Sequence, residues 1–241
     1  MAGALTVVGT GIDVTTHLTP GAQAAIESAD EVMYVVADPV AALRIEALNP
    51  SAHSLDSLYA ADKDRRRTYD EMAEAFVQPA RSGLRSCAVL YGHPGVFALP
   101  AHVALQRARA EGISARMLPA ISALDCLFAD LGTDPGSTGL HCYEATHFLQ
   151  RRPAVDEDAT LVLLQPGMIG EQGGEPTPAV AGRFRQLVEQ LRELYCEARE
   201  GVLYTASPYP AGRPSIVRFS LADPEPPTPD LAATLCILGK G

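Results

Sequence analysis

The sequence predicts an α/β protein of two domains. Short β-branched segments alternate with helix-length amphipathic segments in the first half, which is typical of a parallel sheet with crossover helices. The pattern changes after residue 117, and a chain of 241 residues with 47% hydrophobic content can form two α/β domains. We therefore expect one domain at residues 1–117 and a second at 118–241.

Four strands are expected in the first domain, at residues 5–8, 32–36, 87–91 and 113–117. Thr19 and Pro20 form an N-cap followed by a proline at the first helical position, which predicts a helix that runs to Ser28. A second helix is expected at residues 100–111, ended by Gly112. A third begins near Asp64.

The second domain is expected to begin with a helix at residues 122–131. Apolar runs predict five strands, at residues 140–145, 160–165, 202–207, 215–221 and 234–238. Residues 167–178 are rich in Gly, Pro and Glu, so we expect an exposed loop there. A long helix should follow at residues 178–199.

Composition excludes several classes of function. A formal net charge of -10 without a long basic cluster argues against partners such as nucleic acid or an anionic membrane surface. The five cysteines lie far apart without C-x-x-C spacing, which favours a reducing compartment and no structural zinc. The N-terminus lacks a basic region and no apolar stretch is long enough to cross a bilayer, so we expect a cytoplasmic protein.

Two glycine turns follow predicted strands. The first, Gly9-Thr10-Gly11, lacks the third glycine of a dinucleotide fingerprint because Val14 occupies that position, so a tight turn explains it at least as well as NAD binding. The second runs from Gly92 to Gly95 and offers backbone groups at the carboxyl end of a strand. From physical reasoning alone, this second turn is either a binding loop or a structural turn.

The helix that begins near Asp64 places a charge on its apolar side. Arg65 lies one turn before Tyr69 on a stripe that continues through Met72 and Phe76. An inward guanidinium needs a partner or a wet cavity, although it can also extend past the helix end to a carboxylate such as Asp62. Both interpretations stay open. We expect Arg66 and Arg67 to be surface charges.

Together these motifs resemble a known family. Four motifs follow one another along the chain: Gly9-Thr10-Gly11, Leu18-Thr19, Tyr91-Gly92-His93-Pro94-Gly95 and Leu118-Pro119-Ala120-Ile121-Ser122. Their order is similar to that in the tetrapyrrole methylase (class III methyltransferase) superfamily. His93 replaces the aspartate of the usual Gly-Asp-Pro-Gly turn. This replacement, with Asp125-Cys126-Leu127-Phe128-Ala129-Asp130 and Tyr143-Glu144-Ala145, resembles the borosin peptide backbone N-methyltransferases.

The resemblance implies two α/β domains that hold S-adenosyl-L-methionine in the cleft between them, in a homodimer. It carries the cofactor pocket over to Tyr91, His93, Val96, Phe97, Ser122, Ala123, Tyr143, Gln165 and Ala206. It carries the catalytic cluster over to Tyr59, Arg65, Tyr69 and Tyr91. Ser122 is explained equally well as the N-cap of the helix that it opens.

The resemblance also implies a peptide substrate. Fungal members are fused to the peptide that they methylate, whereas this chain stops at Gly241, so we expect a separate ribosomal precursor peptide, as in the split members. The alternative enzyme is a methylase of a tetrapyrrole or another small molecule, such as a corrinoid precursor. A different alternative is a catalytically inactive homologue that serves as a binding subunit.

A mechanism follows from these residue types. The lone pair of a peptide nitrogen is delocalised into the carbonyl, so methylation requires that the proton be removed or the imidate form be stabilised. Arg65 and a tyrosine hydroxyl would donate hydrogen bonds to the amide oxygen. Tyr69 or Tyr59 would accept the proton, and the nearby guanidinium is expected to lower the pKa of that phenol.

Overall fold

The computed structural model describes residues 3–13, 15–36, 38–60, 63–171, 179–195 and 199–240. Contacts divide the chain into two compact units, Met1–Ser122 with Pro208–Gly212, and Ala123–Ser207 with Arg213–Gly241. The division falls five residues after the expected boundary, because the backbone N–H of Leu118 donates to Val7 (2.9 Å) and keeps this segment on the first sheet. Tyr209, in the short second segment of the first unit, donates to Asp38 (2.8 Å).

The first unit is built on an all-parallel sheet. Its strands follow the order β3-β2-β4-β1-β5, and every neighbouring pair is parallel, as the sequence predicts. Their bounds are β1 (Ala4–Gly9), β2 (Glu31–Val35), β3 (His53–Ser54), β4 (Arg85–Leu90) and β5 (Ser114–Met117). The short β3 was not expected from the sequence.

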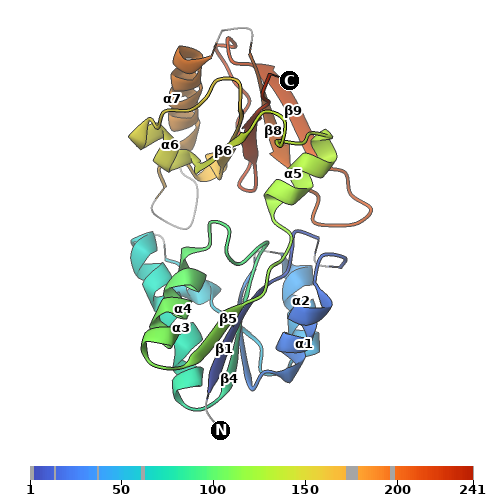
Figure 1. The fold of residues 1–241 in the computed structure, drawn as a ribbon, viewed down its shortest axis with the longest axis vertical. Helices are drawn as coiled ribbons and strands as arrows, with labels where there is room; N and C mark the ends of the chain where they lie inside the picture. Colours follow the sequence, from blue (N-terminus) through green and yellow to red (C-terminus); the bar gives the residue numbers. More distant parts are fainter. Residues whose placement is uncertain are drawn as a thin grey trace. The chain divides into compact units, whose positions relative to one another are not determined.

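Helices cover both faces of this sheet (Figure 1). They are α1 (Pro20–Ser28), α2 (Pro39–Leu48), α3 (Arg65–Arg81) and α4 (Leu99–Ala110), with a 3₁₀ turn η1 (Asp56–Leu58) before α3. The hydroxyl of Thr19 accepts the N–H of Ala22 at the start of α1, as the cap pattern predicts. The carboxylate of Asp38 caps α2 in the same way, with a proline next, although this helix was not predicted.

The core of the first unit has two halves because successive strand residues point to opposite faces. Val8 and Val89 pack with α1 and α2, whereas their neighbours Val7 and Ala88 pack with α3 and α4. Phe76 of α3 is fully buried in the second half. Both faces are therefore apolar, as expected for the central strands of a doubly wound sheet.

The second unit contains a mixed sheet of five strands. Its order is β6-β7-β10-β8-β9, in which only the β6–β7 pair is parallel. The bounds are β6 (Leu140–Glu144), β7 (Thr160–Leu164), β8 (Glu200–Thr205), β9 (Ser215–Ser220) and β10 (Thr234–Ile237). All five agree with the predicted strands to within two residues.

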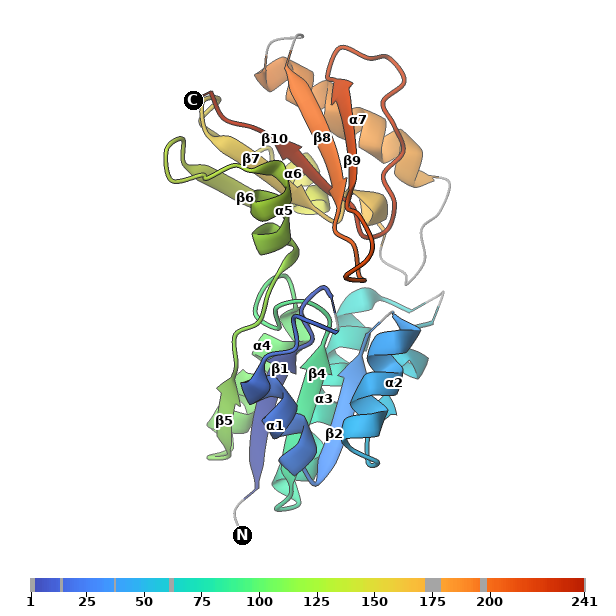
Figure 2. The ribbon, with the colours of Figure 1, turned by 90° about the vertical axis from the view of Figure 1, so that its right-hand side faces the viewer.

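Three helices flank the second sheet. Helices α6 (Ala145–Arg151) and α7 (Ala179–Leu194) pack on one face around Phe148 and Phe184, and α5 (Ala123–Leu131) lies on the other (Figure 2). The buried Tyr204 of β8 donates to Asp130 of α5 (2.6 Å). Helix α6, only seven residues long, was not predicted.

The prediction of an exposed loop at residues 167–178 is wrong for its first residues. Residues 166–168 form a 3₁₀ turn, η2 (Pro166–Met168), and this turn and Ile169 are buried. A Cβ on Gly167 would lie 2.0 Å from the carbonyl oxygen of Asp230, so close packing explains this glycine. Residues 172–178 lie outside the described part, as do residues 196–198 of the helix expected at 178–199.

Within the described ranges, His, Cys, Asp and Glu side chains do not gather in groups of three or more that could hold a metal ion. None of the helices assigned there combines the length and apolar character needed to cross a membrane.

Candidate functional site

The first sheet has a topological switch between β1 and β4. These strands are neighbours, yet β1 leads to α1 on one face while β4 leads to α4 on the other. In open α/β sheets, ligands bind outside the carboxyl ends of the strands at such a switch, because the two connections diverge there. Both glycine turns of the sequence lie at this point.

The two turns are joined by a reciprocal pair of backbone hydrogen bonds. The N–H of Gly11 donates to Gly92 (3.2 Å), and the N–H of Gly92 donates to Gly11 (3.1 Å). Both residues have positive φ, of 71° and 67°, which favours glycine. A Cβ on Gly9 would lie 2.0 Å from the carbonyl oxygen of Gly92, so this position also requires glycine. Gly9-Thr10-Gly11 is thus part of the same structure as the second turn.

The loop after Gly92 is held by its own hydrogen bonds. The N–H of Val96 donates to the His93 carbonyl (3.1 Å), which closes a turn with Pro94 as its second residue. The N–H of Gly95 donates to Nδ1 of His93 (2.9 Å), so in the neutral ring the proton lies on Nε2. An aspartate could accept the same N–H bond, which explains why this turn can use either residue.

Two aromatic residues flank this turn and remain exposed. Tyr91 exposes 44% of its surface and Phe97 exposes 45%, and Val96 between them is partly buried. Phe97 also has a φ of 53°, a strained conformation for a residue with a side chain. A Cβ on Gly92 would meet Ile12 at 3.6 Å, an ordinary van der Waals contact, so this glycine leaves room for a side chain or for close approach of a ligand to the backbone. These features fit the adenosyl group that the resemblance implies.

Three of the predicted catalytic residues lie together. Tyr59 follows η1, Arg65 is the first residue of α3 and Tyr69 lies one turn later. Tyr69 and Arg65 both act electrostatically on the Tyr59 phenol, so the three groups lie within electrostatic range of one another. The Nε atom of Arg65 is shielded from solvent, so its side chain does not simply extend into water. Asp62, the alternative partner, lies outside the described residues.

Tyr59 corrects one part of the expected mechanism. Its pKa is raised from 10.0 to about 12, chiefly by burial and then by the neighbouring Tyr69, whereas the charge of Arg65 lowers it by less. Loss of hydration raises the pKa of Tyr59 more than the guanidinium lowers it, although Tyr59 exposes 36% of its surface. The expected fall in phenol pKa is therefore wrong for Tyr59, which stays protonated at neutral pH.

Tyr91 lies in a separate loop at the same edge of the sheet. Its backbone N–H donates to Val35 at the end of β2 (3.2 Å), which fixes the start of the loop. The segment that carries Tyr59 follows β3, and β3, β2 and β4 are consecutive parallel strands. All four predicted catalytic residues therefore belong to the carboxyl edge of the first sheet.

The second unit brings three predicted cofactor residues to one edge of its own sheet. Tyr143 lies near the end of β6, Gln165 follows β7 and Ala206 follows β8, and these three strands run in the same direction. Gln165 has a φ of 60°, a second strained side-chain-bearing position. Tyr143 stacks between His141 and His147, with ring centroids 6.4 and 6.3 Å away.

The remaining two cofactor candidates lie where the chain passes from the first unit to the second. Ser122 is buried, with 6% of its surface exposed, and Ala123 begins α5. Their contribution to cofactor binding stays a prediction.

Sequence reasoning missed the polar turn that follows Gly11. Oδ1 of Asp13, a residue with 5% exposure, accepts the N–H and hydroxyl of Thr15 and the N–H of Thr16. The N–H of Asp13 donates to Nδ1 of His17 (3.1 Å). The D-x-T-T pattern after a glycine turn was the available signal, because short polar side chains bond to nearby backbone in turns.

Comparisons with known proteins agree with this architecture. Residues 4–207 match the family model described as tetrapyrrole (corrin/porphyrin) methylases. Among solved structures, uroporphyrin-III-C-methyltransferase from Thermus thermophilus aligns with a TM-score of 0.69 and 20% identity, covering 99% of this chain and 93% of that one. A diphthine synthase aligns with a TM-score of 0.66 and 16% identity, covering 98% and 90%. These structures share the fold.

Curated relatives are more similar in sequence. A methyltransferase and type I borosin cyclic peptide precursor from Coprinopsis marcescibilis is 40% identical over 222 residues, 91% of this chain and 57% of that protein. The methyltransferase and omphalotin A precursor from Omphalotus olearius is 41% identical over 221 residues, 92% and 53% respectively. The chain thus spans about half the length of the curated relatives that it matches.

Proposed function

Because this chain belongs to the tetrapyrrole (corrin/porphyrin) methylase family, we propose that it is an S-adenosylmethionine-dependent methyltransferase that N-methylates backbone amides of a ribosomally made precursor peptide. The cluster of Tyr59, Arg65 and Tyr69 is the observation that carries this proposal. A partly buried guanidinium that acts electrostatically on a nearby phenol suits a substrate whose carbonyl oxygen gains negative charge.

The carboxyl edge of the first sheet would hold the cofactor. Gly92 allows close approach of a ligand to the backbone, and the exposed rings of Tyr91 and Phe97 offer apolar surface. The Nε2–H of His93 remains able to donate a hydrogen bond, because Nδ1 already accepts one from Gly95. When bound, the sulfonium supplies a methyl group that is electrophilic without further activation. The other proposed contacts of the cofactor are Ser122, Ala123, Tyr143, Gln165 and Ala206.

The catalytic residues would act on the peptide amide. Arg65 and the protonated Tyr59 would donate hydrogen bonds to the amide oxygen, which stabilises the imidate form and raises electron density on nitrogen. Tyr69, in its phenolate form, would receive the amide proton and become the neutral phenol, because Tyr59 holds its own proton too firmly for that role. Tyr91 would complete the cluster from the loop after β4.

We also propose that the substrate is a separate peptide, that the enzyme is a homodimer and that it acts in the cytoplasm. The resemblance to borosin methyltransferases supports a peptide substrate and a homodimer, whereas the relatives named above are described as methyltransferase and precursor in one protein, so the separate peptide is the part that most needs a test. Mixing the chain with a precursor peptide from a neighbouring reading frame tests methylation in trans, and analytical ultracentrifugation tests the dimer. Modification of a fused peptide alone would overturn the separate-substrate proposal.

Arg65→Ala and Tyr69→Phe test the catalytic cluster. We expect both variants to bind S-adenosylmethionine with unchanged calorimetric affinity and to lose methyl transfer by at least about 100-fold, since their groups act on the peptide amide. Intact-mass analysis of the peptide measures the transfer.

Arg66→Ala is the matched control, because Arg66 is exposed on the same helical turn. It should retain the wild-type rate. Substantial turnover in both cluster variants would refute the assigned roles. Methylation of a corrinoid precursor, with none on the peptide, would instead identify a small-molecule methylase.

A further inference from the structure

Lys63 connects the turn that carries Tyr59 to helix α3. Its ammonium group donates to the carbonyl oxygen of Leu58 (2.8 Å) and forms an ion pair with Glu71 of α3. Only 19% of the Lys63 side chain is exposed. A lysine this well covered requires such partners, because burying an unpaired ammonium is costly. Neither the sequence motifs nor the proposed mechanism assigns it a role.

The carbonyl that Lys63 binds belongs to the same peptide group as the N–H of Tyr59. This group is planar, so fixing its oxygen also restricts the position of the Tyr59 Cα atom. The hydroxyl of Thr68, a fully buried residue of α3, lies 3.5 Å from the same oxygen. The N–H of Tyr59 donates to Asp56 (3.0 Å), which closes the other side of the turn. The backbone before Tyr59 is thus tied to α3 through Leu58.

The ion pair ties Lys63 to the helix that carries the other two catalytic candidates. Hydrogen bonding to Lys63 holds the pKa of Glu71 below its ordinary value, and Arg67 adds to this effect. Arg67 is 77% exposed, so its pair with Glu71 is more strongly screened by solvent than that of Lys63. Glu71 lies on the same helix as Arg65 and Tyr69, so Lys63 spans the two segments of the cluster.

We propose that Lys63 is a positioning residue that holds Tyr59 beside Arg65 and Tyr69 by bridging the Leu58 carbonyl and Glu71. Its effect on methyl transfer rests on the function proposed above, whereas its effect on the place of Tyr59 does not. Lys63 touches neither the peptide nor the cofactor in this role. It acts through the position of the Tyr59 hydroxyl.

Lys63→Met tests the proposal, because methionine keeps an unbranched apolar stem and removes the ammonium. Arg67→Met is the matched control, since it removes the other cation bound to Glu71 without touching Leu58. Lys63→Arg keeps the charge and the donors. Each full-length variant is labelled with fluorotyrosine, and Tyr59→Phe identifies the Tyr59 resonance in the fluorine NMR spectrum.

In Lys63→Met the Tyr59 resonance should shift or broaden, while that of the buried Tyr204 stays in place. Single-turnover methyl transfer should fall about 10- to 100-fold with cofactor affinity unchanged, because a displacement near 1 Å can cost that much. Arg67→Met should match wild type, and Lys63→Arg should recover most of the rate and the Tyr59 resonance.

An unchanged Tyr59 resonance in Lys63→Met would overturn the proposal, as would equal effects of Lys63→Met and Arg67→Met. If Lys63→Met does not fold, Glu71→Gln replaces it, and an unmoved Tyr59 resonance there has the same meaning. Absence of methyl transfer in the wild-type protein would refute the proposed function only, because the resonance still reports whether Lys63 positions Tyr59.

Discussion

At the scale of single residues, Tyr59 illustrates a competition between burial and charge. A guanidinium favours the phenolate, but loss of hydration disfavours it more, and the pKa rises to about 12. A phenol with such a pKa is a hydrogen-bond donor across the whole physiological range. Whether the Tyr59 phenol acts as a hydrogen-bond donor or as a base therefore depends on how the surrounding residues pack.

Tyr59→Phe should therefore lower methyl transfer by about 100-fold, as expected when one donor to a developing oxyanion is removed. The shape of the pH profile between pH 7 and 10 should not change, because Tyr59 does not titrate there. Rates measured in single turnovers across this range check both statements. Loss of an ionisation in the variant within that interval would show that Tyr59 is the base.

The same pKa has a consequence for stability. The ordinary value is 10.0 and the folded value is about 12, so between these limits the folded chain keeps a proton that the unfolded chain releases. The contribution of Tyr59 to the free energy of unfolding is fully present below pH 10 and is lost as the pH rises through 12.

Gly92 can be tested against a glycine of similar backbone conformation. Gly92 and Gly112 have φ of 67° and 74°, so alanine at either position carries a strain of about 1 kcal/mol. Gly112 follows the C-cap of α4, and within the described part of the chain a Cβ there would meet nothing within 4 Å apart from its chain neighbours. Gly92→Ala should weaken calorimetric affinity for S-adenosylmethionine at least about tenfold, and Gly92→Val should abolish it, because a side chain then occupies the ligand approach.

Gly112→Ala should show the same loss of stability with unchanged cofactor affinity. Equal affinities in the wild type and in Gly92→Val would refute the proposed cofactor loop.

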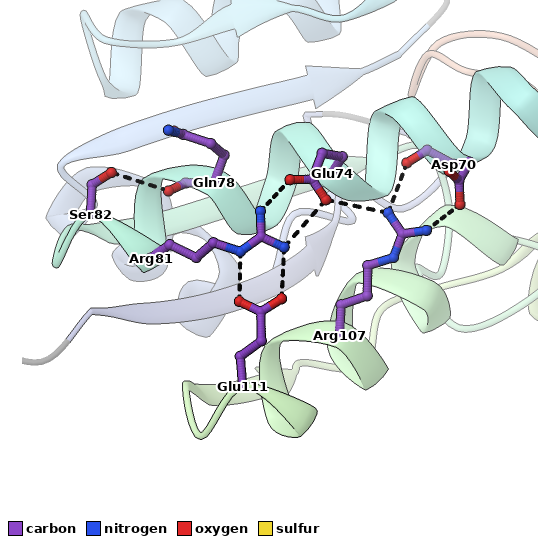
Figure 3. Close-up of polar contacts among 7 residues, drawn as sticks. All are labelled: Asp70, Glu74, Gln78, Arg81, Ser82, Arg107 and Glu111. Atoms are coloured by element: carbon purple, nitrogen blue, oxygen red, sulfur yellow. Dashed lines mark hydrogen bonds and ion pairs between the residues drawn. The ribbon is translucent and has the colours of Figure 1, made fainter.

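At the scale of elements, α3 is joined to α4 by a ladder of charges (Figure 3). Arg107 of α4 bonds to Asp70 and to Glu74, and Arg81 of α3 bonds to Glu74 and to Glu111 at the end of α4. Hydrogen bonds from Arg81 hold the pKa values of Glu74 and Glu111 below their ordinary range. Asp70 and Glu74 lie one turn apart on the exposed side of α3, opposite Phe76, so the ladder borders the buried contact between the helices.

Arg81→Met should lower the midpoint of thermal unfolding by about 2 to 4 °C at low salt, because it removes a network and not one isolated pair. The difference from wild type should shrink in high salt, since exposed charges are screened. Differential scanning calorimetry at two salt concentrations measures both effects. Arg66→Met is the control and should leave the midpoint unchanged. A salt-independent loss would attribute the effect to packing of the arginine stem.

At the scale of the molecule, each unit has its own hydrophobic core. The clusters around Phe76 and around Ile26 draw only on the first unit, and the cluster around Phe148 and Phe184 draws only on the second. The site in the first unit lies where its core ends and its parallel strands release their loops. Loops at this edge can differ in sequence while the strands below keep their packing.

Much of this architecture is predictable because its signals are local. Runs such as Leu161 to Leu164 lie on strands, and the Thr19–Pro20 pair begins α1 where the cap pattern places it. Helix α2 was missed although Asp38 and Pro39 repeat that pattern, and α6 was missed because seven residues carry too little periodicity. The buried turn at Pro166–Met168 was missed because its composition is that of a loop, and its burial depends on contact with Asp230.

The sequence by itself determined the family, the two-part α/β organisation and the residues that follow each strand, because these depend on motif order and hydrophobic period. Tertiary structure decided which loops meet: Gly11 and Gly92 are 81 positions apart in the chain, yet their backbones bond because β1 and β4 are neighbours. It also decided that Tyr59 is a donor and that Lys63 holds its turn to α3. Hydration and contact geometry are properties of packed atoms, so no pattern of residues along the chain could supply them.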